Sequence, residues 1–185
     1  MVLHVETFVK PYMRSWSLIQ SELNIRPLQA EDWELVRSIY LDGIATGHAT
    51  FEVEAPTWNH WNNAHLLAPR LVAASAGSIL GWAALNAVST RAVYAGIAEV
   101  SVYVDTGSRR HGVGRALLET LITHSEREGI WTLQASIFPE NVASIGLLKS
   151  CGFRLVGTRE RIGRMNGIWR DTWLLERRSS MVSSD

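Results

Sequence analysis

The sequence predicts a single α/β domain with a mixed β-sheet that carries helices on both faces. Strand patterns dominate the first half of the chain and strand and helix patterns alternate in the second half, which is typical of such a sheet. A chain of 185 residues with 46% hydrophobic residues can bury one sizeable core, and it has no internal repeat. We therefore expect one domain over residues 24–176, after an extension of unknown role at 1–23 and before a flexible tail at 177–185.

The first half of the expected domain contains strands and short helices. Its first helix has an apolar stripe of Leu35, Ile39 and Tyr40, and Ala76-Gly77 suits the turn of a hairpin. The expected elements are a strand at 25–28, a helix at 33–43, a short helix at 57–67 and hairpin strands at 70–75 and 78–88.

The second half begins with a strand whose two faces differ. From Glu99 to Val104 the even positions are all valine, whereas the odd positions are Glu, Ser and Tyr. A carboxylate is therefore expected at the entrance of a buried strand. The remaining expected elements are a helix that starts near Gly112, a strand at 131–137, a helix from Ser144 and two final strands.

The turn before the Gly112 helix is suited to a phosphorylated ligand. The first N–H groups of a helix have no partner within it and lie at the positive end of its dipole, so they can bind an anion. Glycine at 112 and 114 leaves room for a diphosphate, and Arg109, Arg110 and Arg115 add positive charge. A glycine turn without a ligand is the alternative interpretation.

Two commoner phosphate motifs are excluded by spacing. A Walker A loop needs Lys-Ser/Thr after its second glycine, but Val113-Gly114 follows Gly112. A dinucleotide fingerprint from Gly112 needs a small residue at position 117, which is Leu117.

Two segments together resemble the GNAT superfamily of N-acyltransferases. The first is Arg-x-x-Gly-x-Gly after a valine-rich strand, and the second runs from Asn141 to Gly152-Phe153. Asn141 also suits a helix N-cap and Gly152 a helix C-terminus, so capping is an alternative reason for both. The resemblance implies the superfamily fold and acetyl-CoA as co-substrate, bound by Val102, Tyr103, Val104, Arg109, Arg110, His111, Gly112, Val113, Gly114, Arg115, Asn141 and Ser144.

Within the superfamily, residues 24–176 are similar to the phosphinothricin, methionine sulfoximine and arsinothricin acetyltransferases. The similarity is carried by Thr50-Phe-Glu-Val-Glu-Ala-Pro-Thr57, Gly81-Trp-Ala-Ala84, Arg91-Ala-Val-Tyr94, Ala98–Val104 and Gly163–Asp171. These enzymes acetylate the α-amine of glutamate-like molecules in a ternary complex. The resemblance implies a homodimer, Glu99 as the base that deprotonates the ammonium, and a substrate pocket that contains Phe51, Arg91, Tyr94 and Glu99.

Two positions depart from that pattern. Leu148 stands where relatives have a tyrosine or histidine that can protonate the leaving thiolate, so water or another group such as Tyr103 must replace it. Ser89 stands where several relatives have a second arginine. Cys151 lacks a suitable His/Asp context for acyl-cysteine chemistry, and we expect a small buried residue there.

Composition and the spacing of possible metal ligands reduce the number of functional classes that fit the sequence. Eighteen basic and eighteen acidic residues cancel, which gives no general attraction to nucleic acid, and the six histidines and one cysteine show no metal-ligand spacing. The chain has no signal peptide or membrane-span pattern, so we expect a cytoplasmic protein with no metal and no membrane partner. Acetylation of a protein or peptide amine, and a non-catalytic acyl-CoA-binding module, remain as alternatives.

Overall fold

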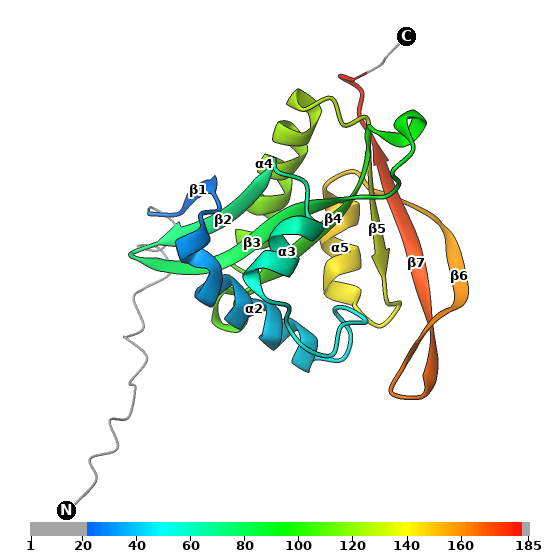
Figure 1. The fold of residues 1–185 in the computed structure, drawn as a ribbon, viewed down its shortest axis with the longest axis horizontal. Coiled ribbons are helices and arrows are strands. Elements are labelled where there is room, and N and C mark those ends of the chain that lie inside the picture. Colours follow the sequence, from blue (N-terminus) through cyan, green and yellow to red (C-terminus); the bar gives the residue numbers. More distant parts are fainter. Residues whose placement is uncertain (1–21, 183–185) are drawn as a thin grey trace, which may run out of the picture.

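The computed structural model describes residues 22–182 and has the expected mixed α/β architecture (Figure 1). One seven-stranded sheet has the order β1-β2-β3-β4-β5-β7-β6. Its strands are β1 (Asn24–Pro27), β2 (Arg70–Ser75), β3 (Ser78–Ala87), β4 (Ile97–Val104), β5 (Thr132–Ile137), β6 (Arg154–Met165) and β7 (Ile168–Arg178). The helices are α2 (Trp33–Ala45), α3 (Trp58–Ala64), α4 (Val113–Arg127) and α5 (Val142–Ser150).

The sheet separates at its centre. All neighbouring strands are antiparallel except β4 and β5, which run parallel and pair only through Ile97–Glu99 and Thr132–Gln134. Beyond these residues β5 stays paired with β7 and β4 stays paired with β3. We call this divergence, from Glu99 and Gln134 onward, the fork.

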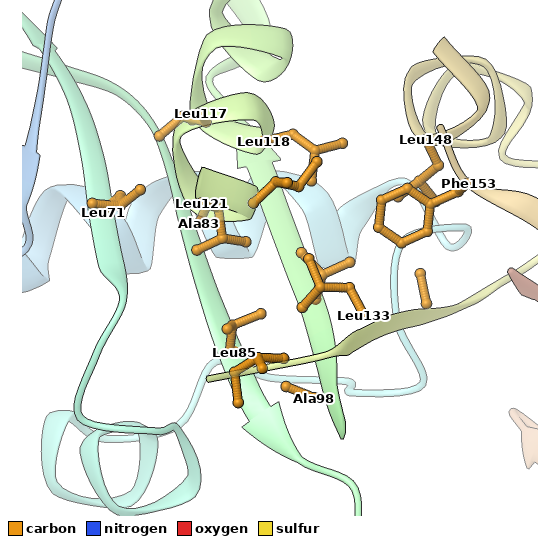
Figure 2. Packing of buried hydrophobic residues seen from close by; sticks show 14 of the residues in the cluster. Leu71, Ala83, Leu85, Ala98, Leu117, Leu118, Leu121, Leu133, Leu148 and Phe153 are labelled. Carbon is orange, nitrogen blue, oxygen red and sulfur yellow. The ribbon is translucent and has the colours of Figure 1, made fainter. Parts of the chain in front are cut away.

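Two hydrophobic clusters cover the two faces of the sheet. The larger one packs α4 and α5 against the strands, and Figure 2 shows Leu117, Leu118 and Leu121 of α4 in the same cluster as Leu148 and Phe153. The smaller one joins α2 and α3 to the opposite face through a set of aromatic rings. The valines of β4 belong to the first cluster and Tyr103 to the second, which confirms the expected difference between the two faces.

The expected stripe of the first helix is wrong at one residue. Val36 is fully buried in α2, whereas Leu35 is 49% exposed. Trp33, Val36, Ile39 and Gly43 are the buried residues of α2, and their spacing of three and four residues keeps one face of the helix against the sheet.

The expected C-terminal tail begins too early. Arg177 and Arg178 are the last residues of β7 and pair with Leu133 and Thr132 of β5. An ion pair of 2.9 Å joins Arg177 to Glu126 of α4, and the Ser179 hydroxyl donates to the same carboxylate. The expected extension at 1–23 lies almost wholly outside the described residues. No helix within residues 22–182 is long and apolar enough to cross a membrane.

Candidate active site

Glu99 lies at the point where the fork opens. Its carboxylate accepts a hydrogen bond from the Ser136 backbone N–H at 3.3 Å and one from the Gln134 side-chain amide at 3.5 Å. Ser136 lies two residues after Gln134, the last residue of β5 that pairs with β4, so it belongs to the part of β5 that has separated from β4. The Glu99 side chain therefore satisfies a backbone donor that the separated β4 no longer reaches.

The turn before α4 has the backbone of an anion-binding loop. The first backbone hydrogen bond of the helix runs from Ala116 N–H to the Gly112 carbonyl, so the preceding N–H groups lie outside the helical ladder. Gly112 has φ +84° and Arg110 φ +63°, and a left-handed residue at the N-cap is a position that favours glycine. The conformation of Gly112, rather than limited space, requires a glycine there.

Gly114 is explained by packing. A Cβ at this position would lie 3.3 Å from both the Leu147 and the Val104 side chains, so its absence lets α4 approach α5 and β4 closely. Val113 is buried in the core, so its backbone, and not its side chain, is available to a ligand. Arg109 donates to the Val104 carbonyl at 3.3 Å, which ties the turn to the end of β4.

Asn141 caps α5 as expected and also reaches across the fold. Its Oδ1 accepts a hydrogen bond from the Ser144 N–H at 3.2 Å, and its Nδ2 donates to the His48 carbonyl at 3.1 Å. Gly152 follows the C-cap with φ +88°, which confirms the expected helix end. The second contact of Asn141 joins the start of α5 to the segment 46–57 between α2 and α3, which we call the acceptor loop.

Arg170 of β7 holds the same loop. Its guanidinium donates to the Gly47 carbonyl at 3.3 Å, lies 3.4 Å from His48 Nδ1 and pairs with Glu140 at 3.2 Å. It also lies over the Phe138 ring at 4.2 Å. A hydrogen bond from its own backbone N–H, and after it the hydrogen bond and ion pair from Arg170, lower the pKa of the Glu140 carboxyl.

Phe51 lies in the acceptor loop against β5 and β6. Its ring meets Phe138 edge to face at 4.7 Å, and a Cβ on Gly163 would lie 2.6 Å from the Phe51 ring. The loop, the end of β5 and the β6–β7 hairpin therefore meet around Phe51.

Arg91 and Tyr94 come together on the loop between β3 and β4. The guanidinium lies 5.5 Å from the Tyr94 ring centroid, and both side chains are exposed. The Ser89 hydroxyl accepts the Arg91 N–H at 3.2 Å, so this serine shapes the turn at the position where the family resemblance implies a second arginine. Within residues 22–182, Arg91 forms no ion pair.

A cleft of about 590 Å³ opens on the α2 and α3 side of the sheet. The rings of Tyr40, Trp61 and Trp82 line it, as do Ser101, on the same strand as Glu99, and Asn86, the partner of Glu99 in β3. Glu52 and Glu54 of the acceptor loop add two exposed carboxylates to its wall. Neither Arg91 nor Tyr94 is among the lining residues.

Tyr103 occupies an aromatic cluster beside this cleft. Its ring stacks on Trp82 at 4.7 Å, and its hydroxyl donates to the Ala49 carbonyl at 3.4 Å. Burial raises the pKa of the Tyr103 phenol well above its ordinary value. A phenol in this state is a weak proton donor, which disfavours Tyr103 as a substitute for the acid missing at position 148.

Leu148 lies in the core and not in the fork. Its side chain is 4% exposed and packs beside Phe153 in the larger cluster (Figure 2). Cys151 is partly buried against the same cluster, and its sulfur lies 3.9 Å from the Ser150 hydroxyl.

Four side chains near the site were not expected from the sequence. Gln134 and Ser136 could have been found from the polar positions that alternate with Leu133 and Ala135 along β5. Arg170 lies within the Gly163–Asp171 segment that carries the family similarity, so that segment was the signal for it. Arg159 has no comparable signal, because it lies in a charge-rich strand and reaches Ser136 only through strand pairing.

Residues 25–174 match the family model described as an acetyltransferase (GNAT) domain. The chain is 34% identical over 181 residues to a phosphinothricin N-acetyltransferase of Alcaligenes faecalis, covering 94% of this chain and 91% of that protein. It is 30% identical to an L-methionine sulfoximine/L-methionine sulfone acetyltransferase of Pseudomonas paraeruginosa, covering 83% of this chain and 92% of the relative.

A solved structure gives the same family likeness. The GNAT superfamily phosphinothricin acetyltransferase of Sinorhizobium meliloti, crystallised with AcCoA, superposes with a TM-score of 0.79 at 26% identity. The superposition covers 89% of this chain and 92% of that one. The matched family, the relatives and the fold with its central fork agree, and the chain belongs to the GNAT family of acetyl-CoA-dependent N-acetyltransferases.

Proposed function

We propose that the protein transfers the acetyl group of acetyl-CoA to the α-amine of a glutamate-like amino acid, by direct attack in a ternary complex. Phosphinothricin, methionine sulfoximine and arsinothricin are the substrate types we propose. The observation that carries the proposal is the position of Glu99, whose carboxylate lies at the opening of the fork and is oriented by Ser136 and Gln134. Relatives named for phosphinothricin and methionine sulfoximine support the choice of amine.

The cofactor side consists of the β4 edge and the start of α4. Beyond Glu99, β4 has β3 on one edge and no partner strand on the fork side within residues 22–182. An exposed strand edge can hydrogen-bond the amide groups of an extended ligand such as pantetheine. The N–H groups around Gly112–Arg115 would then hold the diphosphate, and Arg109, Arg110 and Arg115 would add charge.

Glu99 would act on the incoming amine. An amino acid carries its amine as an ammonium at neutral pH, which cannot attack a thioester until a proton is removed. The Glu99 carboxylate would take this proton directly or through a water. A backbone N–H near Val102 would then stabilise the negative charge that develops on the thioester oxygen.

No side chain at position 148 can protonate the leaving thiolate. Leu148 is apolar and buried, and the phenol of Tyr103 donates to Ala49 on the other face of the sheet. We propose that solvent at the fork supplies this proton. Turnover then needs one positioned base and no positioned acid.

Acetylation of a peptide N-terminus is the second candidate. The cleft beside Ser101 carries the carboxylates of Glu52 and Glu54, which suit a cationic peptide more than an acidic amino acid. A fold neighbour described as a ribosomal-protein-alanine N-acetyltransferase of Brucella melitensis is 28% identical with a TM-score of 0.77.

A thiol-release assay with acetyl-CoA separates the two candidates. The panel consists of phosphinothricin, methionine sulfoximine, arsinothricin, glutamate, norleucine and short peptides with free N-termini. We expect turnover with the first three compounds and much lower kcat/KM with peptides. Turnover with peptides alone would contradict the proposed substrate and favour the second candidate.

A further inference from the structure

We propose that Arg159 binds the distal oxyanion of the acceptor, opposite the amine that Glu99 receives. This inference rests on the proposed function and assigns the distal anion of a phosphinothricin-type or arsinothricin-type acceptor to a residue of the β6–β7 hairpin. Three observations support this role: the strand register, the contacts of Arg159 and Glu99 with one serine, and the ion pairing of the arginines around the fork.

The register places Arg159 on the same face of the sheet as Glu99. Arg159 pairs with Thr172 in β7, and Leu174, two residues further on, pairs with Ser136 in β5. Ser136 lies two residues after Gln134, the partner of Glu99. Paired residues in adjacent strands, and residues two apart in one strand, point to the same face.

Ser136 connects the two charged groups directly. Arg159 Nη1 lies 3.4 Å from the Ser136 hydroxyl, and the Ser136 N–H donates to Glu99 at 3.3 Å. The guanidinium and the carboxylate therefore contact two different atoms of the same residue. An amine bound to Glu99 and an oxyanion bound to Arg159 would lie farther apart than an amine and a carboxylate on the same α-carbon. This separation suits the distal group of a glutamate-like chain better than its α-carboxylate.

The charge of Arg159 is not neutralised by the protein. Arg159 is exposed and forms no ion pair with any residue from 22 to 182. Three other arginines of the hairpin are engaged elsewhere: Arg154 pairs with Glu176, Arg164 lies over Trp169, and Arg170 pairs with Glu140. A guanidinium in this state can bind a carboxylate or phosphinate with two hydrogen bonds.

The position also compensates for a residue that the β3–β4 loop lacks. Ser89 accepts the Arg91 N–H and contributes no charge, and Arg91 lies on Tyr94 outside the cleft lining. Arg159 approaches the fork from the opposite side, through β6. In this chain the acceptor anion is therefore bound by Arg159 of the β6–β7 hairpin and not by a second arginine on the β3–β4 loop.

The test is a comparison of substrates with and without a distal anion. Phosphinothricin and norleucine have chains of similar length, but only the first has an oxyanion at its end. In Arg159→Leu we expect kcat/KM for phosphinothricin to fall about tenfold to a hundredfold, the usual range for losing hydrogen bonds to a charged group. The value for norleucine should change less than about threefold.

Three further variants make the result specific. Arg159→Lys keeps a point charge without the two-pronged geometry and should lose part of the effect. Arg159→Glu should favour ornithine over phosphinothricin. Arg164→Leu removes the same charge from the same hairpin and should leave the phosphinothricin-to-norleucine ratio unchanged, while thermal unfolding checks that each variant is folded.

Calorimetric titration of phosphinothricin in the presence of coenzyme A gives a readout that does not need turnover. If the parent binds and acetylates phosphinothricin and Arg159→Leu shows the same substrate ratio and affinity, the role of Arg159 is wrong while the proposed function stands. If the parent neither binds nor acetylates it, the proposed substrate fails and the inference fails with it. An equal loss for both substrates would also overturn the inference, because it would indicate a general effect on the fork.

Discussion

The cofactor side and the acceptor side of the fork are built in different ways. The cofactor side comes from one continuous stretch, in which β4 leads through the Gly112 turn into α4. The acceptor side is assembled from the acceptor loop, the β3–β4 loop, the end of β5 and the β6–β7 hairpin. A continuous stretch can be read from sequence motifs, whereas an assembled surface depends on register and on contacts between distant segments.

Glu99 lies where the two sides meet, so its substitution has the largest expected effect. Glu99→Gln keeps the size and a hydrogen-bonding group but cannot accept a proton, and we expect kcat to fall about 10²- to 10⁴-fold. The dissociation constant of acetyl-CoA, measured by calorimetry, should stay within about twofold if binding belongs to the other side of the fork. Glu34→Gln, an exposed carboxylate on α2 away from the cofactor turn, is the control and should retain full turnover.

On the cofactor side, Gly112→Ala forces an alanine into a left-handed conformation. We expect a loss of about 1–2 kcal/mol in the free energy of unfolding and a higher KM for acetyl-CoA. Gly167→Ala imposes the same strain in the β6–β7 turn, where φ is +81°, and should lower stability without changing that KM. Equal effects of the two variants on KM would contradict a cofactor role for the Gly112 turn.

On the acceptor side, Arg170→Leu should release the acceptor loop, because it removes the contacts of Arg170 with Gly47 and His48 of that loop. We expect KM for the amine to rise about threefold to tenfold, because the lost contacts hold the loop rather than a reacting atom. KM for acetyl-CoA should not change, and hydrogen exchange at residues 47–51 should become faster. Arg164→Leu serves as the control. A rise in KM for acetyl-CoA alone would contradict the assignment of Arg170 to the acceptor side.

Tyr103→Phe should have the smallest effect. Burial keeps the pKa of this phenol above its ordinary value, so it stays protonated across pH 6–9 and neither gains nor loses a proton during turnover. We expect kcat within about twofold of the parent and the same pH–rate profile. A large fall in kcat at alkaline pH would show that Tyr103 protonates the thiolate after all.

The difference between the continuous cofactor side and the assembled acceptor side explains which features could be predicted from the sequence. The strands, the Gly112 helix start and the Asn141 cap follow from local periodicity and capping, and the structure confirms them. The apolar stripe of α2 was wrong at Leu35, because several registers of apolar residues fit one helix until the sheet selects a face.

Most of the acceptor side could not be predicted from the sequence. Ser136 and Arg159 are 23 residues apart in the chain, and their approach depends on β7 being placed between β5 and β6. The contact between Asn141 and His48 spans 93 residues and has no local signature. Sequence motifs therefore identify the cofactor chemistry more readily than the amine.

A crystal structure with acetyl-CoA and methionine sulfoximine would show directly whether the cofactor and the acceptor amine meet at the fork beside Glu99. We predict pantetheine along the open edge of β4, the diphosphate at the N–H groups of Gly112–Arg115, and the acceptor amine bound to Glu99 directly or through one water. Pantetheine in the aromatic cleft beside Trp61 and Trp82, or an amine bound away from Glu99, would contradict this prediction.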